Sequence, residues 1–385
     1  MKIALCLESP LRLQGGVSVL VQALAEGLRG KYELVLVSPD SEKDLAATKA
    51  GALFAEHIFW QPTDVCAASS KALAEKLARA GVKLAHFHGG TFGWGNRFPG
   101  ACPIPYARRR GIRVCTTAHL VGDWLDGFCG PAKPLWFKLL LLPVAMLGKL
   151  STLACADREI CVSQHDCKIL ARRYWPLRNR FVQIYHSRVR SGTLQPGSLT
   201  RRKVVLCVGH LARRKGQHLL AQAFCKIAAD FPEWELWLAG PALEENTPRE
   251  IENSAAAANA AGRVKLLGER LDAVTLMREA AIYVQPSLLE PLGLALQEAM
   301  FAGCACIGSR VGGIPELISD DSAGVLVEPG NVDALASQLR RLMNSPETCE
   351  RLGRAAAHSM IARGMTWENM VQQHLTLYEK ILRQE

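Results

Sequence analysis

Two series of alternating strand-like and helix-like segments constrain the fold of this chain more than any other feature. Short apolar runs alternate with longer segments whose apolar residues recur at helical spacing. Such alternation predicts an α/β fold with parallel sheets covered by helices on both faces. The expected strands are 2–7, 33–37, 83–88, 113–117, 159–162 and 181–185 in the first series, and 203–208, 235–239, 264–267, 281–284, 305–307 and 325–327 in the second.

The two series indicate two domains. A length of 385 residues is long for one compact core. The segment 190–200 between the series contains Gly, Pro and Ser, which is typical of a flexible connection. We therefore place the domain boundary there. Hydrophobic content of 49% and charged content of 21% exclude a disordered chain.

The segment from Glu290 to Glu298 is the most informative about function. Pro291 suits the first turn of a helix and Gly293 lets a ligand approach the backbone, so Glu290 is expected near the helix cap. Glu298 is then expected about two turns further in. Free N–H groups at such a helix start can face a diphosphate, while the two carboxylates accept hydrogen bonds from sugar hydroxyls. Taken alone, an ordinary amphipathic helix with exposed glutamates explains the segment equally well.

The residues on both sides of this segment favour a ligand site. Residues 281–287 are expected to form a buried strand ending in a loop, and a strand at 305–308 is followed by the glycine turn 309–316. In open α/β sheets ligands collect at the carboxyl ends of the strands. The run from Tyr283 to Glu316 resembles the donor site of the retaining family 4 glycosyltransferases, with Leu292 where that family often has Phe.

The resemblance implies a GT-B fold, in which two Rossmann-like domains face each other across a cleft. The N-terminal domain, 1–190, would hold the acceptor, and the C-terminal domain, 201–365, would hold the nucleotide-sugar. The terminal segment 366–385 resembles the family's final helix, which packs back on the N-terminal domain.

The resemblance also implies roles for individual residues. Glu298 would bind the nucleotide ribose, and Glu290 would bind the transferred sugar. Lys215 and the pair Gly293-Leu294 would stabilise the diphosphate leaving group, and His119 would orient the reacting sugar. The expected catalytic residues are therefore His119, Glu290 and Lys215.

A basic loop, 208–216, opens the C-terminal domain. Negative charge builds on the phosphate oxygens as a nucleotide leaves a sugar, and fixed Lys or Arg groups stabilise that charge without a metal. Lys215 matches the family's phosphate-binding lysine, whereas His210 stands where family members usually carry arginine. His210 could still donate a hydrogen bond, Arg213 or Arg214 could supply the missing charge, or turnover could be low. Without the glutamate segment, a solvated basic loop would be the better interpretation.

In the N-terminal domain, two glycines and two histidines follow predicted strands. Gly15 and Gly16 fit a plain tight turn equally well, but the resemblance makes them the glycine loop that approaches the donor phosphates. His88 and His119 each end a strand, where a histidine is more often a structural hydrogen-bonding group. For His119 the resemblance favours donor contact, and for His88 both interpretations remain open.

No cofactor or metal is expected, since the nucleotide-sugar is a co-substrate and no DxD-type metal motif is evident. The 13 cysteines lack paired CxxC spacing, which supports neither a disulfide framework nor a zinc ribbon. The amino terminus resembles a core strand and lacks the features of a secretory signal. Together these features favour a cytoplasmic location.

The apolar stretch 134–150 bears on membrane association. Its longest uncharged part, between Lys138 and Lys149, contains a proline and is well short of the about 20 residues that span a bilayer. A helix carrying Trp, Phe and two lysines could instead lie in a membrane interface, and the net charge of +10 favours an anionic leaflet. A buried helix of the N-terminal domain is the equal alternative. No basic recognition helix interleaved with aromatic residues indicates nucleic-acid binding.

We therefore expect a retaining glycosyltransferase that moves a sugar from a nucleoside diphosphate donor to a carbohydrate or glycolipid acceptor, such as a bacterial lipopolysaccharide core. Two alternatives remain. A nucleotide-sugar 2-epimerase-like isomerase, which has a related two-domain fold, would convert the donor without an acceptor. A non-catalytic protein would bind a membrane surface tightly and nucleotide-sugars weakly.

Overall fold

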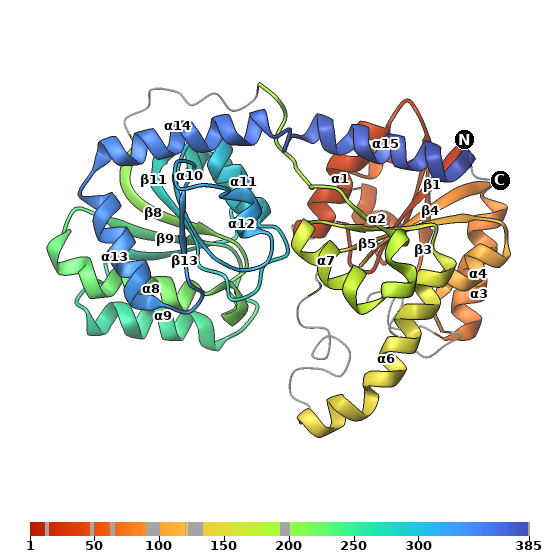
Figure 1. The fold of residues 1–385 in the computed structure, drawn as a ribbon, viewed down its shortest axis with the longest axis horizontal. Coiled ribbons are helices and arrows are strands. Elements are labelled where there is room, and N and C mark those ends of the chain that lie inside the picture. Colours follow the sequence, from red (N-terminus) through yellow and green to blue (C-terminus); the bar gives the residue numbers. More distant parts are fainter. Residues whose placement is uncertain are drawn as a thin grey trace. The chain divides into compact units, whose positions relative to one another are not determined.

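The computed structural model describes residues 1–11, 15–46, 50–61, 66–89, 101–119, 121, 134–192 and 201–383. These residues form two compact units, each built around one parallel sheet with helices packed against it (Figure 1). The first unit comprises residues 1–186 together with 367–385, and the second comprises residues 187–366. The predicted α/β fold class is confirmed.

The first unit holds a seven-stranded parallel sheet. Its strands are β1 (Lys2–Leu7), β2 (Glu33–Ser38), β3 (Glu56–Phe59), β4 (Val82–Gly89), β5 (Arg113–Ala118), β6 (Arg158–Cys161) and β7 (Phe181–Gln183). They lie in the order β3-β2-β1-β4-β5-β6-β7. The edge strand β3 was not predicted from the sequence, because only Ile58 of its four residues is buried and it shows no apolar run.

The described parts of the connections between these strands contain helices. They are α1 (Gly16–Leu28), α2 (Glu42–Ala46), η1 (Gly51–Leu53), α3 (Ala67–Arg79), α4 (Pro103–Arg109), α6 (Leu135–Cys155), α7 (Gln164–Arg173) and η3 (Trp175–Arg180). The last helix of the chain, α15 (Trp367–Arg383), also belongs to this unit.

Helix α15 packs against α1 with an apolar face. Val371 lies so close to Gly27 of α1 that a Cβ at that glycine would collide with the valine side chain. At the start of α15, the Trp367 indole N–H donates a hydrogen bond of 2.7 Å to the carbonyl of Ala23. Tyr378 is fully buried in the same core. These contacts hold the C-terminal helix on the N-terminal sheet.

Helix α6 is the one helix among the described residues that is long and apolar enough, by length and composition, to cross a bilayer. It has 21 residues and ends at Cys155, which makes it longer than the predicted stretch. Its first half extends away from the sheet (Figure 1), and Trp136 and Leu140 are each 67% exposed. Its second half is anchored, because Lys149 is buried and its Nζ lies 2.6 Å from Oε2 of Glu159 on β6. The prediction of a buried helix thus holds for the second half only, and the first half is apolar and exposed.

The second unit holds a six-stranded parallel sheet in the order β10-β9-β8-β11-β12-β13. These strands are β8 (Arg202–Val208), β9 (Glu235–Ala239), β10 (Val264–Gly268), β11 (Ala280–Gln285), β12 (Ala305–Ser309) and β13 (Val325–Val327). The helices are η4 (Arg213–Lys215), α8 (Gln217–Ile227), η5 (Ala228–Asp230), α9 (Asn246–Ala257), α10 (Ala273–Glu279), α11 (Leu294–Phe301), α12 (Ile314–Leu317), α13 (Val332–Met343) and α14 (Pro346–Ala362). Side chains of β8, β11 and β12 share one core with α8, α9 and α13.

Candidate functional site

The strand order of the second sheet reverses between β8 and β11. These two strands are hydrogen-bonded neighbours, but the chain continues from β8 to β9 on one side and from β11 to β12 on the other. Ligands of open α/β sheets bind outside such a switch point, at the carboxyl ends of the strands. The loops that leave these two strands, 209–216 and 286–293, carry most of the predicted donor-binding residues.

Glu290 is the centre of a buried polar network in the second of these loops. Its Oε2 accepts hydrogen bonds from Lys215 Nζ at 2.7 Å, Ser287 Oγ at 3.1 Å and Gln285 Nε2 at 3.2 Å. Gln285 in turn accepts one of 2.9 Å from the Tyr283 hydroxyl. None of the hydrogen bonds among the described residues reaches Oε1 of Glu290, so that oxygen can accept from a ligand. Gln285 and Ser287 were not predicted as site residues, although their polar side chains at a strand end were a usable signal.

Two glycines allow the loops around this network to pack closely. A Cβ at Gly216, whose φ is +73°, would collide with the carbonyl oxygen of Pro286. A Cβ at Gly312, whose φ is +55°, would collide with the carbonyl oxygen of Glu290. The N–H of Gly313 donates to that same carbonyl at 3.3 Å. The glycine turn after β12 therefore fixes the backbone of the glutamate loop, which only residues without a side chain permit.

Helix α11 begins later than predicted. Its first residue is Leu294 and its N-cap is Gly293, which has a φ of +98°. The prediction that Pro291 lies in the first turn and Glu290 at the cap is wrong, because the left-handed backbone at Gly293 separates both from the helix. Glycine has no side chain to cap the helix, so the first N–H groups of α11 remain available to an anion.

Glu298, the fifth residue of α11, is buried and paired. Its Oε1 lies 3.2 Å from Nη1 of Arg188, at the start of the same unit. Burial raises the pKa of the Glu298 carboxyl above its ordinary value, and the Arg188 charge acts in the opposite direction. Arg188 was not predicted, because it lies far away in the sequence and belongs to no motif.

The basic residues in the loop after β8 differ in their burial and in their ion pairs. His210 is half-buried, and burial lowers its pKa below the ordinary value, with further lowering by Lys215 and Arg214. A histidine at this place is therefore neutral near pH 7. Arg213 is exposed and its Nη1 pairs with Glu250 at 2.6 Å, whereas Arg214 makes no ion pair with any described residue. Of the two arginines considered as replacements for the missing charge, Arg214 is thus the better placed.

The first sheet has its own switch point between β1 and β4. Gly15 precedes α1, which begins at Gly16, so both predicted glycines lie directly at the start of that helix. His88 lies on β4, and its Nδ1 is 3.2 Å from Nε2 of His119, which follows β5. The backbone N–H of His119 donates a hydrogen bond of 2.9 Å to the backbone carbonyl of Gly89. Burial lowers the pKa of His119 to about 3, so its ring is neutral near pH 7.

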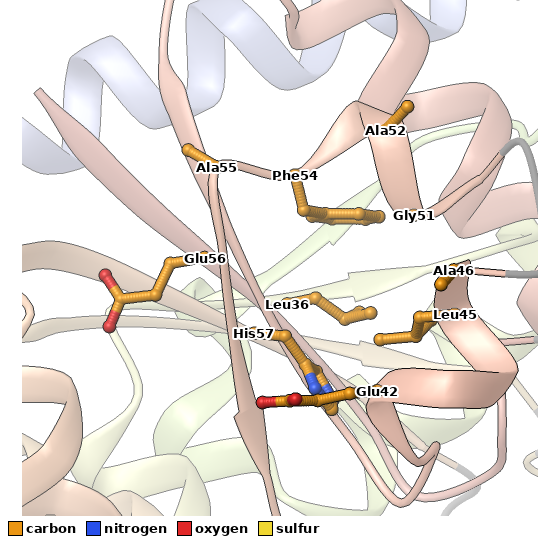
Figure 2. A pocket seen from close by; sticks show the side chains of 10 residues that line it. All are labelled: Leu36, Glu42, Leu45, Ala46, Gly51, Ala52, Phe54, Ala55, Glu56 and His57. Carbon is orange, nitrogen blue, oxygen red and sulfur yellow. The ribbon is translucent and has the colours of Figure 1, made fainter.

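The first unit also contains a cavity of about 380 Å³. It lies beside β2 and β3, with Leu36, Leu45 and Phe54 on its apolar side and Glu42 and His57 at its polar side (Figure 2). None of the predicted site residues lines it. We therefore assign the candidate site to the switch points and not to this cavity.

The groups around Glu290 suit a ligand that is both anionic and rich in hydroxyls. Lys215 and the start of α11 offer positive charge and N–H donors, whereas Glu290 and Glu298 offer carboxylate oxygens. Among the residues that the structure describes, no group of three or more His, Cys, Asp or Glu side chains is placed to hold a metal ion.

The fold and the site define a class, that of GT-B proteins built from two parallel α/β units. Residues 14–187 match the family model described as Glycosyltransferase Family 4, and residues 195–359 match the model described as Glycosyl transferases group 1. The chain belongs to the group 1, family 4 glycosyltransferases, as the resemblance of residues 283–316 predicted.

Curated relatives are similar over part of their length. The chain is 30% identical to N-acetyl-alpha-D-glucosaminyl L-malate synthase of Bacillus anthracis over 183 residues, which cover 48% of this chain and 47% of the relative. It is 30% identical to alpha-maltose-1-phosphate synthase of Mycobacterium tuberculosis over 252 residues, which cover 59% of this chain and 64% of the relative. The chain thus spans about half the length of the first curated relatives it matches.

Solved structures share the fold over almost the whole chain. A glycosyltransferase from Rickettsia africae superposes with a TM-score of 0.77 at 18% identity, covering 100% of this chain and 99% of that one. HepE of Anabaena in complex with UDP also superposes with a TM-score of 0.77 at 18% identity, covering 99% of this chain and 100% of HepE. WaaG, a glycosyltransferase involved in lipopolysaccharide biosynthesis, gives 0.72 at 15% identity, covering 96% and 98%. At these identities the likeness supports the GT-B fold alone.

Proposed function

We propose that this protein is a retaining glycosyltransferase that moves a sugar from a nucleoside diphosphate donor to an acceptor. The observation that carries the proposal is the contact of Lys215 with Glu290 at the β8–β11 switch point, beside the uncapped start of α11. The names of the curated relatives and the UDP complexes of solved relatives support a transferase that uses a nucleotide-sugar. They do not favour the isomerase or the non-catalytic alternative.

The leaving diphosphate is the group that needs most stabilisation. As the bond between the sugar and the phosphate breaks, negative charge grows on the phosphate oxygens, and Lys215 and the first N–H groups of α11 are placed to stabilise it. Glu290 holds the Lys215 ammonium group through Oε2 and has Oε1 for a sugar hydroxyl. Glu298 would accept hydrogen bonds from the ribose hydroxyls, and Arg188 offsets part of the rise in its pKa that burial causes.

The family resemblance also gives groups of the first unit roles toward the donor phosphates and the reacting sugar. Gly15 and Gly16 at the start of α1 offer backbone N–H groups to the donor phosphates. A neutral His119 can hold a sugar oxygen without adding positive charge next to a carbon that itself becomes positive. Both roles derive from the family resemblance. The same resemblance implies retention of the anomeric configuration, in which the acceptor attacks the sugar from the face that the phosphate leaves.

Ligand stabilisation of the native state tests the donor site. The thermal midpoint is measured against UDP-, GDP-, ADP- and CMP-sugars, beginning with UDP because of the solved relatives. We expect one nucleotide class to raise the midpoint, and Glu298→Gln to abolish the rise while Glu328→Gln, a surface control in the same unit, leaves it unchanged. No shift with any donor at millimolar concentration would contradict the proposal. The anomeric configuration of the product, read by NMR, tests retention.

The acceptor is proposed to be a glycolipid of the cell envelope, such as a lipopolysaccharide core, reached from the cytoplasmic face of the membrane. The exposed first half of α6 carries Trp136 and Leu140, and η3, which contacts α6, adds Trp175 at 70% exposure. The described cysteines are free thiols, which fits a reducing compartment. Lys149 and its buried partner tie the second half of α6 to the sheet, so the helix would lie in the membrane interface and not span the bilayer.

Flotation with liposomes containing anionic phospholipid tests this part of the proposal. The double variant Trp136→Ser, Leu140→Ser should lose most vesicle binding, because it removes two exposed apolar side chains from the surface. Leu271→Ser is the matched control, since Leu271 is 85% exposed on the second unit. Wild-type protein that stays with the soluble fraction would overturn membrane association, although donor binding would remain a separate question.

A further inference from the structure

Five of the ten histidines lie together in the first unit and form a closed ring of imidazoles. Ring centroids are 3.9 Å apart for His86 and His88, 5.4 Å for His88 and His119, and 5.5 Å for His119 and His186. The ring closes through His374, 5.7 Å from His186 and 6.0 Å from His86. We call these five residues the histidine ring. All except the half-buried His119 are at most 2% exposed.

The ring joins segments that are distant in the sequence. His86 and His88 point to the same face of β4, because they are two residues apart on a strand. His119 follows β5. His186 is the last residue of the first unit before the chain enters the second unit. His374 comes from α15, so the C-terminal helix contributes one of the five imidazoles, which contacts His86 and His186.

Hydrogen bonds fix several members of the ring. His86 bonds through Nε2 to Thr117 Oγ1 at 2.7 Å and through Nδ1 to the Tyr378 hydroxyl at 2.5 Å. His374 Nδ1 donates to the carbonyl of Met370 at 2.8 Å, because a carbonyl can only accept. Nε2 of His374 is consequently an acceptor, and none of the described residues donates to it. Thr117 on β5 and Tyr378 on α15 thus hold the ring from two sides.

A neutral imidazole has one donor nitrogen and one acceptor nitrogen, so a bond to one nitrogen determines what the other can do. Burial lowers the pKa of each ring member below its ordinary value, and most ring members lower one another further. The contact between His88 Nδ1 and His119 Nε2 is therefore a bond between two neutral rings. The nitrogen of His119 that is left for a ligand is Nδ1.

We propose that His88 is a positioning residue that fixes the tautomer and the orientation of His119, with the histidine ring and α15 holding His88 in place. The proposal rests on the proposed function, in which His119 holds a sugar oxygen; Nδ1 is the ring nitrogen left for that contact. The ring has no geometry that could hold a metal ion, as is true of every group of three or more His, Cys, Asp or Glu side chains among the described residues. The positioning role gives a reason for four buried histidines to surround the half-buried His119.

The test compares two amide replacements of His88 by NMR of ¹⁵N-labelled histidine at pH 7.5. Asparagine places an amide atom where Nδ1 stands and can keep the bond to His119, whereas glutamine places it nearer to Nε2 and cannot. We expect wild-type protein and His88→Asn to show one neutral tautomer of His119, and His88→Gln to show a mixture. We also expect turnover to fall about 10²-fold in His88→Gln and to recover at least tenfold in His88→Asn, with the donor KM changed less than threefold in both.

The ¹⁵N shifts decide the inference even if no donor is turned over. A mixture of His119 tautomers in wild-type protein would overturn it without any variant. A single unchanged tautomer in His88→Gln would overturn it as well, because His88 would then contribute only packing. A third outcome is possible, in which wild-type protein shows one His119 tautomer, His88→Gln shows a mixture, and wild-type protein turns over no donor. That outcome would count against the proposed function and not against the positioning role.

Discussion

Mild acid should destabilise the first unit through the histidine ring. A histidine whose folded pKa lies below its unfolded value contributes stability that is complete above about pH 6.5 and is lost as the pH falls towards the folded pKa. Burial lowers the pKa to about 3 for His119 and to about 4 for His374, and well below the ordinary value for the other three. Tyr378, which contacts two ring members, stays neutral because burial raises its pKa. The loss should therefore fall between about pH 6.5 and pH 4.

The magnitude follows from the number of buried rings. At pH 5.5 an unfolded histidine is about 90% protonated while the folded ring members remain neutral. Each ring member then lowers the free energy of unfolding by about 1.4 kcal/mol relative to pH 7.5, so five lower it by about 7 kcal/mol. Typical stabilities are about 5 to 15 kcal/mol, so this loss is comparable to the whole stability of a domain.

Hydrogen exchange of peptides from β4 and α15 at pH 7.5, 6.5 and 5.5, corrected for the intrinsic rate, measures this loss for the first unit alone. His374→Gln should reduce the acid loss by about one fifth, since one of five titrating groups is removed. His165→Gln, at an exposed position on α7 of the same unit, should leave the loss unchanged. Equal protection at pH 7.5 and 5.5, or an unchanged acid loss in His374→Gln, would refute the reasoning.

Three further predictions each test a single contact. His210→Arg should tighten donor binding about tenfold, because it restores a permanent charge beside the phosphates, and titration calorimetry that shows no gain would contradict this. Lys149→Met should lower the free energy of unfolding, measured in urea, by about 3–5 kcal/mol, since it leaves the buried Glu159 carboxylate without its counter-ion, and adding Glu159→Gln should restore most of the loss. Gly312→Ala should weaken donor binding, whereas Gly330→Ala, with a similar positive φ but no collision, should only lower stability by about 1 kcal/mol. Equal donor affinity in the two alanine variants would show that the collision is relieved without moving the glutamate loop.

The sequence predicted the strands well and the start of α11 poorly, for different physical reasons. A buried strand needs a run of apolar side chains, which is visible in residues next to one another, as in β8 and β11. The start of α11 depends on the backbone angle of Gly293, and glycine is compatible with several conformations. Pro291 was therefore placed in the helix although it precedes it. The edge strand β3 escaped prediction because it buries too little to leave a pattern.

The sequence by itself determined the α/β class, the glutamate segment, the basic loop and His119 as candidates, because periodicity and motifs are local properties of the chain. Only the tertiary structure decided which side chains meet. It paired Lys215 with Glu290 and Arg188 with Glu298, and it brought His374 into contact with the ring that holds His119. Such pairs are far apart in the sequence, and their distances depend on strand order and helix packing, which no spacing of residues records.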